Sequence, residues 1–137
     1  MGKALGIDYG TKRTGIAITD SLQIIASGLT TIPTHLLDEF ISDIVKKEDV
    51  DFFVVGDPKN LNGTKTNNTS HVNGFVKRLT KLYPIIPVHL VDERFTSKIA
   101  KQSIISSGIS KKGRQNKELV DEVSATIILQ NYLYYRV

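Results

Sequence analysis

The most informative stretch of the chain is KALGIDYGTKRTGIAIT, which runs from Lys3 to Thr19. Its first part alternates small and apolar residues and ends at Asp8, which predicts a β-strand. The glycine and polar residues that follow are typical of a tight turn. A second apolar run, residues 14–19, is close enough to pair with the first as a hairpin. The stretch therefore predicts two antiparallel strands, with an acid at the end of the first.

The remainder of the chain predicts one more strand of this meander and then alternating helices and strands. The expected elements are a strand at residues 24–32, a helix at 36–45, a strand at 51–56, a helix at 72–82, a strand at 88–92, and helices at 96–107 and 118–134. Helices are expected where apolar residues recur at helical spacing, with Thr34 as an N-cap and Leu82 turned inward. The run at 51–56 is continuously apolar, as in a strand buried on both faces, and residues 88–92 are expected to form another buried strand. This order predicts an α/β fold, in which a three-strand antiparallel meander and two parallel strands form a five-stranded mixed sheet flanked by helices.

Length and composition restrict the class of protein. A chain of 137 residues is expected to form one domain over residues 1–137. Hydrophobic residues make up 40% and charged residues 23%, which argues against wholesale disorder. The sequence has no cysteine and no apolar run of membrane-spanning length, which excludes a disulfide framework, a thiol nucleophile and an apolar membrane helix. We therefore expect a soluble, cytoplasmic protein that does not associate with a membrane.

The charge of the chain is unevenly distributed. The net charge is +4, but residues 59–117 hold 12 lysines and arginines and only 2 acids, Asp92 and Glu93. A field of this kind suits a polyanion, and nucleic acid is the foremost example. A solvated lysine-rich surface explains the charge alone equally well.

Three groups of acids occupy places that differ from ordinary helix surface. Asp8 ends the first strand, Asp92 and Glu93 end the last strand, and Asp121 and Glu122 are expected in the first turn of the last helix. Ligands of such sheets collect beyond the carboxyl ends of the strands. Any one of these acids alone is better explained as a turn or cap residue. Together they favour a site for magnesium or manganese, in which two ions assist phosphodiester hydrolysis.

Several motifs resemble those of one known family. They are GIDYGTKRTGIA at residues 6–17, DERFTS at 92–97, DEVSATIILQNYL at 121–133, and GDP at 56–58 with Gly63 beyond it. In this order they resemble the YqgF (RuvX) family, which is ribonuclease H-like and related to RuvC Holliday junction resolvases. The resemblance covers nearly the whole chain. Asp57 and Ser124 depart from the family pattern, which has an apolar residue and alanine at these places.

The resemblance implies an activity and a set of catalytic residues. It implies a metal-dependent nuclease in which Asp8, Glu93 and Asp121 are the catalytic acids and the ligands of Mg²⁺ or Mn²⁺. Its substrate would be structured nucleic acid, foremost the 5′ end of the 16S ribosomal RNA precursor (pre-16S rRNA) during ribosome biogenesis. The protein would then be associated with the ribosome. An older interpretation of the family makes its members Holliday junction resolvases that cut branched DNA.

Basic residues beside these motifs are candidate contacts to nucleic acid. They are Lys12, Arg13, Arg94, Lys111, Lys112, Arg114 and Lys117. An arginine such as Arg94 can hold a phosphate with two hydrogen bonds or pair with a carboxylate of the site. A solvated loop is the competing explanation, and it is strongest for Lys111 and Lys112. The histidines have no partner at metal-ligand spacing and are expected to be structural or superficial.

Two other functional classes compete with a nuclease. The GIDYGT stretch also resembles the first phosphate loop of actin-like and sugar-kinase ATPases, but those close two such domains around ATP. A non-catalytic nucleic-acid or ribosome-binding module would have no need for the three acids. The sequence does not decide whether the substrate is RNA or DNA, whether cleavage is endonucleolytic or exonucleolytic, or what the oligomeric state is. It also leaves open which metal serves in the cell and whether Asp57, Asp92 or Glu122 joins the metal ligands.

Overall fold

The computed structural model describes residues 2–57, 69–92 and 117–135, and these form a five-stranded mixed sheet with flanking helices. The strands are β1 (Lys3–Asp8), β2 (Arg13–Thr19), β3 (Ala26–Pro33), β4 (Val50–Asp57) and β5 (Val88–Asp92). The helices are α1 (Leu37–Lys47), which follows the short 3₁₀ helix η1 (Thr34–Leu36), α2 (Thr69–Leu82) and α5 (Lys117–Tyr135). The strand order is β3-β2-β1-β4-β5, with β1, β2 and β3 antiparallel and β4 and β5 parallel to β1. The predicted fold class is confirmed, while the helix expected at 96–107 lies outside the described residues.

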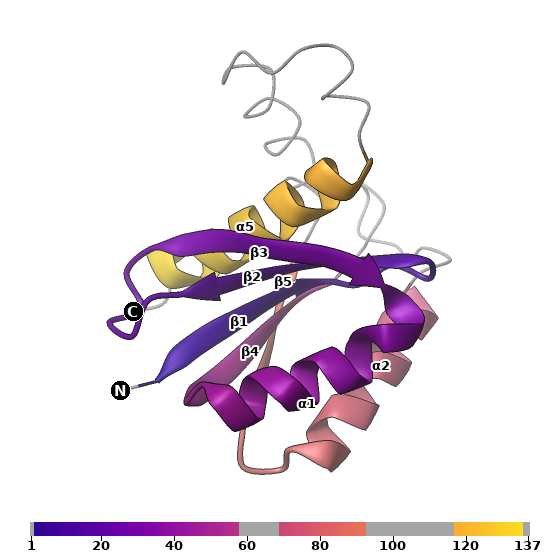
Figure 1. The fold of residues 1–137 in the computed structure, drawn as a ribbon, viewed down its shortest axis with the longest axis horizontal. Coiled ribbons are helices and arrows are strands. Elements are labelled where there is room, and N and C mark those ends of the chain that lie inside the picture. The colour runs from indigo at the N-terminus through magenta and orange to yellow at the C-terminus, as the bar shows by residue number, and fades with distance from the viewer. Residues whose placement is uncertain (1, 58–68, 93–116, 136–137) are drawn as a thin grey trace.

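The described helices lie on both faces of the sheet, with α5 on one face and α1 and α2 on the other (Figure 1). Alternate residues of β1 supply two separate cores, because successive side chains of a strand point to opposite faces. Leu5 and Ile7 belong to the core beneath α1 and α2. Ala4 belongs to the core beneath α5. By this alternation Gly6 and Asp8 share the α5 face of the sheet.

Small residues allow α5 to lie close to the sheet. Gly6, Ala17 and Gly28 are paired across β1, β2 and β3 and form a row beneath the helix. A Cβ atom added to Gly6 would lie 2.7 Å from Cβ of Leu129, and one added to Gly28 would lie 2.6 Å from Oε1 of Glu122. A side chain at Gly6 would also meet the carbonyl oxygen of Ala125 and would push the helix away from the strands, whereas one at Gly28 would displace the Glu122 side chain.

The strand β3 begins later than the sequence predicted, because the residues before it form a loop. Residues 24 and 25 were expected in the strand, but it starts at Ala26. The carboxylate of Asp20 accepts hydrogen bonds from the backbone amides of Leu22, Ile24 and Ile25, at 3.2, 2.9 and 2.9 Å. These amides are consequently used to close a loop, and the side chains of Ile24 and Ile25 remain exposed.

Three further expectations about packing are wrong. Leu36, and not Thr34, is the N-cap residue of α1, because the Thr34 hydroxyl bonds to a different segment. Leu82 is 54% exposed at the end of α2. The strand β5 is half-buried because it forms an edge of the sheet, and Leu90 within it is 48% exposed.

Among the described helices, none combines the length and the apolar character needed to cross a membrane.

Candidate functional site

Asp8 lies at the carboxyl end of β1, directly opposite Gly15 of β2 in the antiparallel pairing. The backbone of α5 passes immediately over this glycine, so that a Cβ atom there would collide with the carbonyl oxygen of Asp121. Asp8 and Asp121 therefore flank the same glycine, one beside it in the sheet and the other above it. The helix begins at Lys117, which places Asp121 in the second turn rather than in the predicted first turn.

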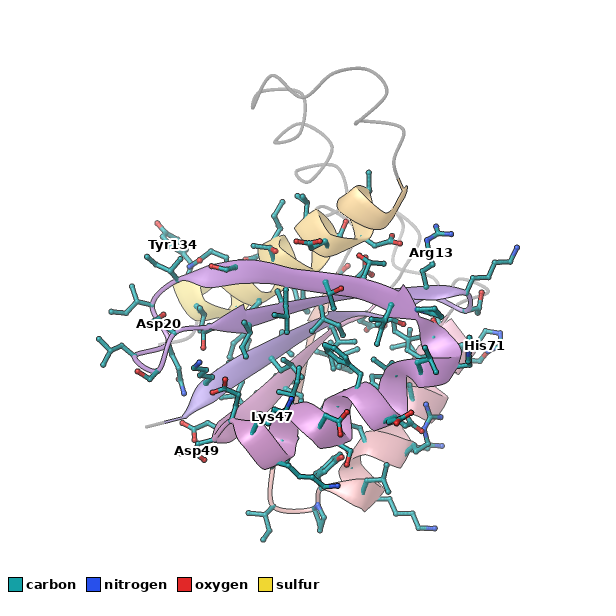
Figure 2. All side chains as sticks on the ribbon, in the orientation of Figure 1. Arg13, Asp20, Lys47, Asp49, His71 and Tyr134 are labelled. Atoms are coloured by element: carbon teal, nitrogen blue, oxygen red, sulfur yellow. The ribbon has the colours of Figure 1, made fainter. Side chains whose placement is uncertain are left out.

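Arg13 connects the start of β2 to this part of the helix. Its Nε donates a hydrogen bond of 3.1 Å to Oδ2 of Asp121, and the two side chains are 36% and 25% exposed. Figure 2 shows Arg13 at the end of the sheet opposite to Asp20 and Asp49. Arg13 was predicted to contact the phosphate backbone, and in this structure its guanidinium is bound to a carboxylate. The guanidinium of Arg13 thus places a positive charge beside the Asp121 carboxylate.

Asp57 and Asp92 lie, like Asp8, at the carboxyl ends of their strands, but they belong to the opposite face of the sheet. They are paired with each other in register at the ends of β4 and β5. Asp57 follows Phe53 and Val55 at a spacing of two residues, and these two residues pack beneath α1 and α2. The strand alternation thus assigns Asp57 and Asp92 to the α1 and α2 face and Asp8 to the α5 face.

Glu122 follows Asp121 but is directed elsewhere. Its carboxylate lies over Gly28 of β3, at the far side of β2 from β1. The consecutive acids of α5 therefore approach different strands. Of the acids that the sequence left open as further ligands, Asp57 and Asp92 lie on the other face and Glu122 lies over the other edge of the meander.

The described residues include only part of the predicted metal-binding set. Within residues 2–57, 69–92 and 117–135, no group of three or more histidines and acids is arranged to hold a metal ion. Glu93, the third predicted acid, lies outside these ranges. The described members, Asp8 and Asp121, offer carboxylate oxygens, which are the donors that Mg²⁺ and Mn²⁺ prefer.

The predicted nucleic-acid contacts are only partly within the described residues. Lys12 is exposed in the turn between β1 and β2, and Lys117 opens α5. Arg94, Lys111, Lys112 and Arg114 lie outside the described ranges.

The described histidines behave as structural or surface residues. His89 belongs to an aromatic group on the α5 face, with ring centroids 5.5 Å from Phe52 and 4.8 Å from Tyr132. His35 and His71 are exposed. The expectation for these residues is therefore confirmed.

Sequence reasoning missed a pair of hydroxyl groups beneath the turn that follows Asp8. The Oγ1 atoms of Thr14 and Thr34 are 2.9 Å apart, and Thr34 also donates a hydrogen bond of 2.6 Å to the carbonyl oxygen of Gly10. Thr34 lies far from Gly10 in the chain, so no local pattern connects them. A threonine immediately before a helical pattern is ordinarily assigned as an N-cap, which concealed its other partner.

Comparison with known proteins identifies relatives along nearly the whole chain. The family model described as "RuvX: Holliday junction resolvase" matches residues 2–135. A protein of Flavobacterium johnsoniae is 56% identical over 133 residues, which span 97% of this chain and 96% of the relative. A protein of Phocaeicola vulgatus is also 56% identical over 133 residues, with the same coverage. Both relatives are named as candidate pre-16S rRNA nucleases.

Solved structures of RuvC share the fold at low sequence identity. Thermus thermophilus RuvC in complex with a Holliday junction substrate has a TM-score of 0.60 and 16% identity, covering 96% of this chain and 93% of that one. A second structure of T. thermophilus RuvC has a TM-score of 0.54 and 13% identity, with 96% and 94% coverage. These similarities establish a common architecture, and a common architecture alone does not define a substrate.

Proposed function

The chain belongs to the RuvX family, and from this we propose that it is a metal-dependent nuclease that hydrolyses phosphodiester bonds of structured nucleic acid. Its proposed substrate is the 5′ end of pre-16S rRNA, in the cytoplasm and during ribosome biogenesis. The names of relatives that are 56% identical over nearly the whole chain support this substrate.

The observation that carries the proposal is the placement of Asp8 and Asp121 around Gly15. Asp8 is the cross-strand neighbour of this glycine, and the Asp121 backbone rests on it. Two acids from distant parts of the sequence are thus brought to the carboxyl end of one strand. Carboxylates gathered at one site repel each other and resist desolvation unless a cation compensates them.

The donor chemistry of these residues fits a hard divalent cation. Asp8 and Asp121, together with Glu93, would hold Mg²⁺ or Mn²⁺. Two bound ions supply an activated water and stabilisation of the leaving oxygen. Arg13 neutralises part of the charge of the Asp121 carboxylate through the 3.1 Å hydrogen bond, so a bound cation would compete with its guanidinium for that carboxylate.

The nucleic acid would approach the α5 face from the side of the β1–β2 turn. Lys12 is exposed in that turn. Arg94 and the run that contains Lys111, Lys112, Arg114 and Lys117 belong to the basic region between residues 59 and 117. These cations would bind phosphates without reading the bases, which positions the strand but carries no sequence information.

A second substrate is favoured by one observation, the description of the matching family as a Holliday junction resolvase. Under that alternative the same acids would cut branched DNA. A protein that binds nucleic acid without cutting it is the third possibility.

One experiment separates these functions. The purified protein is incubated with a pre-16S rRNA fragment that carries its 5′ extension, and separately with a four-way DNA junction. Each reaction contains Mg²⁺, Mn²⁺ or EDTA. Cleavage of the RNA that EDTA abolishes supports the proposal, and cleavage of the junction alone favours the resolvase. Binding without cleavage of either substrate would refute the nuclease function.

A further inference from the structure

Thr34 binds the backbone of the turn between β1 and β2 from outside that turn. The Thr34 amide donates a hydrogen bond of 3.0 Å to the carbonyl oxygen of Lys12. Its hydroxyl donates one of 2.6 Å to the carbonyl oxygen of Gly10. Thr34 belongs to η1, directly after β3, and is separated from the turn by the whole length of two strands. A single residue therefore binds the backbone of the turn at two points.

The direction of the hydrogen bonds can be assigned from the number of protons. A threonine hydroxyl has one proton to donate and two lone pairs to accept with. Thr34 directs its proton at Gly10, so the 2.9 Å contact between the two hydroxyls requires Thr14 to be the donor. Thr14 is fully buried in β2. The order of donation is thus Thr14 to Thr34 to Gly10.

The turn is also packed tightly against itself. A Cβ atom on Gly10 would collide with the carbonyl oxygen of Arg13. The backbone of the turn thus lies against Arg13 on one side and is bound by Thr34 on the other, and Tyr9 within the turn stacks on Phe75 of α2 with ring centroids 4.8 Å apart. This turn joins Asp8, at the end of β1, to the exposed Lys12 and to Arg13, at the start of β2.

We propose that Thr34 is a positioning residue of the nuclease site, which fixes the Asp8–Arg13 turn through its hydroxyl and amide. The inference rests on the proposed function, because it assumes that Asp8 performs chemistry. The hydroxyl binds Gly10, near the acid, and the amide binds Lys12, near the proposed phosphate contact. Loss of the hydroxyl alone should therefore disturb the acid more than the lysine.

The decisive variants are Thr34→Val and Thr34→Ser. Thr34→Val keeps the shape and the amide but removes the hydroxyl, and kcat for RNA cleavage should fall by about tenfold or more, because small displacements of reacting groups are costly. KM should change by less than about twofold, since the bond to the carbonyl of Lys12 remains. Thr34→Ser keeps the hydroxyl and should retain kcat within about threefold of the parent.

Two controls distinguish positioning from general loss of packing. Thr80→Val removes a hydroxyl that donates a hydrogen bond of 2.9 Å to the carbonyl oxygen of Val76 on α2. This hydroxyl lies away from the turn, so the variant should leave kcat unchanged. Thr14→Val removes a more deeply buried hydroxyl but leaves the bond from Thr34 to Gly10 intact. It should therefore lower kcat less than Thr34→Val. If Thr14→Val is the more harmful of the two, or if Thr34→Ser is as impaired as Thr34→Val, the inference is wrong.

A second readout does not depend on cleavage. Amide hydrogen exchange of the peptide that spans residues 9–13 should be faster in Thr34→Val than in the parent, Thr34→Ser or Thr80→Val. If the parent cuts neither substrate, the proposed function fails while the exchange comparison still tests the hold on the turn. If exchange is equal in all four proteins, Thr34 does not fix the turn.

Discussion

The carbonyl oxygen of Asp121 occupies the space in which a side chain on Gly15 would begin. Gly15 is the cross-strand partner of Asp8, so the absence of one side chain allows the acid-bearing turn of α5 to lie on the acid-bearing end of β1. The approach of these two segments is therefore controlled at a residue that itself carries no reactive group.

Replacement of Gly15 by alanine should destabilise the protein. The added methyl group would meet helix backbone, which cannot rotate away, and overpacking of this kind costs about 1–3 kcal/mol. Gly74→Ala is the matched control, since a Cβ atom there meets nothing within 4 Å and lies in the exposed interior of α2. It should stabilise the protein by about 0.5–1 kcal/mol. Urea unfolding of the two variants tests both signs, and a neutral Gly15→Ala would contradict the close contact.

Asp8→Asn should abolish cleavage and preserve the fold. Asparagine keeps the shape of the side chain but loses the charge that holds a divalent cation, so the rate should fall by orders of magnitude. Folding should survive, because removal of one charge relieves repulsion among the acids. Nucleic-acid binding should survive or tighten for the same reason.

Asp57→Asn is the control for this change, because Asp57 ends the neighbouring strand but belongs to the other face of the sheet. It should retain cleavage within a few-fold of the parent. A cleavage assay beside a thermal melt of both variants decides the matter. An Asp8→Asn protein that cuts as fast as the parent would show that Asp8 is only a turn residue.

Arg13→Gln should strengthen binding of Mn²⁺ while costing little stability. Its guanidinium is a cation beside Asp121, and it competes with a metal ion for the same carboxylate. Partly exposed ion pairs contribute less than about 1 kcal/mol. Arg78→Gln is the control, because Arg78 pairs with Asp38 at 2.9 Å on the α1 and α2 side. Calorimetric titration should show tighter Mn²⁺ binding for Arg13→Gln only. Equal or weaker binding would mean that Arg13 assembles the site rather than competing for it.

The stability of the loop before β3 should decrease at acid pH, because Asp20 closes this loop. Its hydrogen bond from the Ile25 amide, and then those from Ile24 and Leu22, lower the pKa of this carboxyl below its usual value of about 3.9. A lowered pKa stabilises the folded state at pH values above the unfolded pKa, and this contribution disappears as the pH falls through the folded pKa. An NMR titration should place the midpoint of Asp20 below about 3.9. A midpoint at or above that value would argue against these hydrogen bonds in solution.

Nucleic-acid binding should weaken steeply as salt rises. Between residues 59 and 117 the chain has 12 basic residues and 2 acids, and contacts of such cations with phosphates release counterions. The logarithm of the binding constant should fall linearly with the logarithm of the salt concentration. An affinity that barely changes between low and physiological salt would show that this region does not bind the backbone.

The parts that the sequence predicted are those that depend on local pattern. The apolar runs of β1, β2 and β4 and the helical spacing of α5 indicated the elements, and the rules of strand connection indicated their arrangement. The edge position of β5 was missed because the valines and the leucine of Val88–Asp92 are also typical of a buried strand. The order of strands, which makes it an edge, is not a property of that segment.

In the candidate site, too, local patterns predicted some features, and others depend on contacts made only after folding. That Asp8 ends a strand could be read from the alternation of β1. The apolar run of β4 is buried on both faces, so it gave no indication that Asp57 belongs to the other face. The bonds from Thr34 to the turn and from Arg13 to Asp121 join segments that meet only after folding. Residue types and spacing cannot specify such partners.

The position of α5 in the chain also determines when the protein can fold during synthesis. Ala4, Phe52 and Val54 face this helix, and they emerge from the ribosome long before residues 117–135 do. Until α5 is made, these side chains lack the helix that covers them in the structure, and exposed apolar surface is prone to aggregate. The delay also keeps Asp8 and Asp121 apart, so under the proposed function a partly synthesised chain would lack one of its catalytic acids.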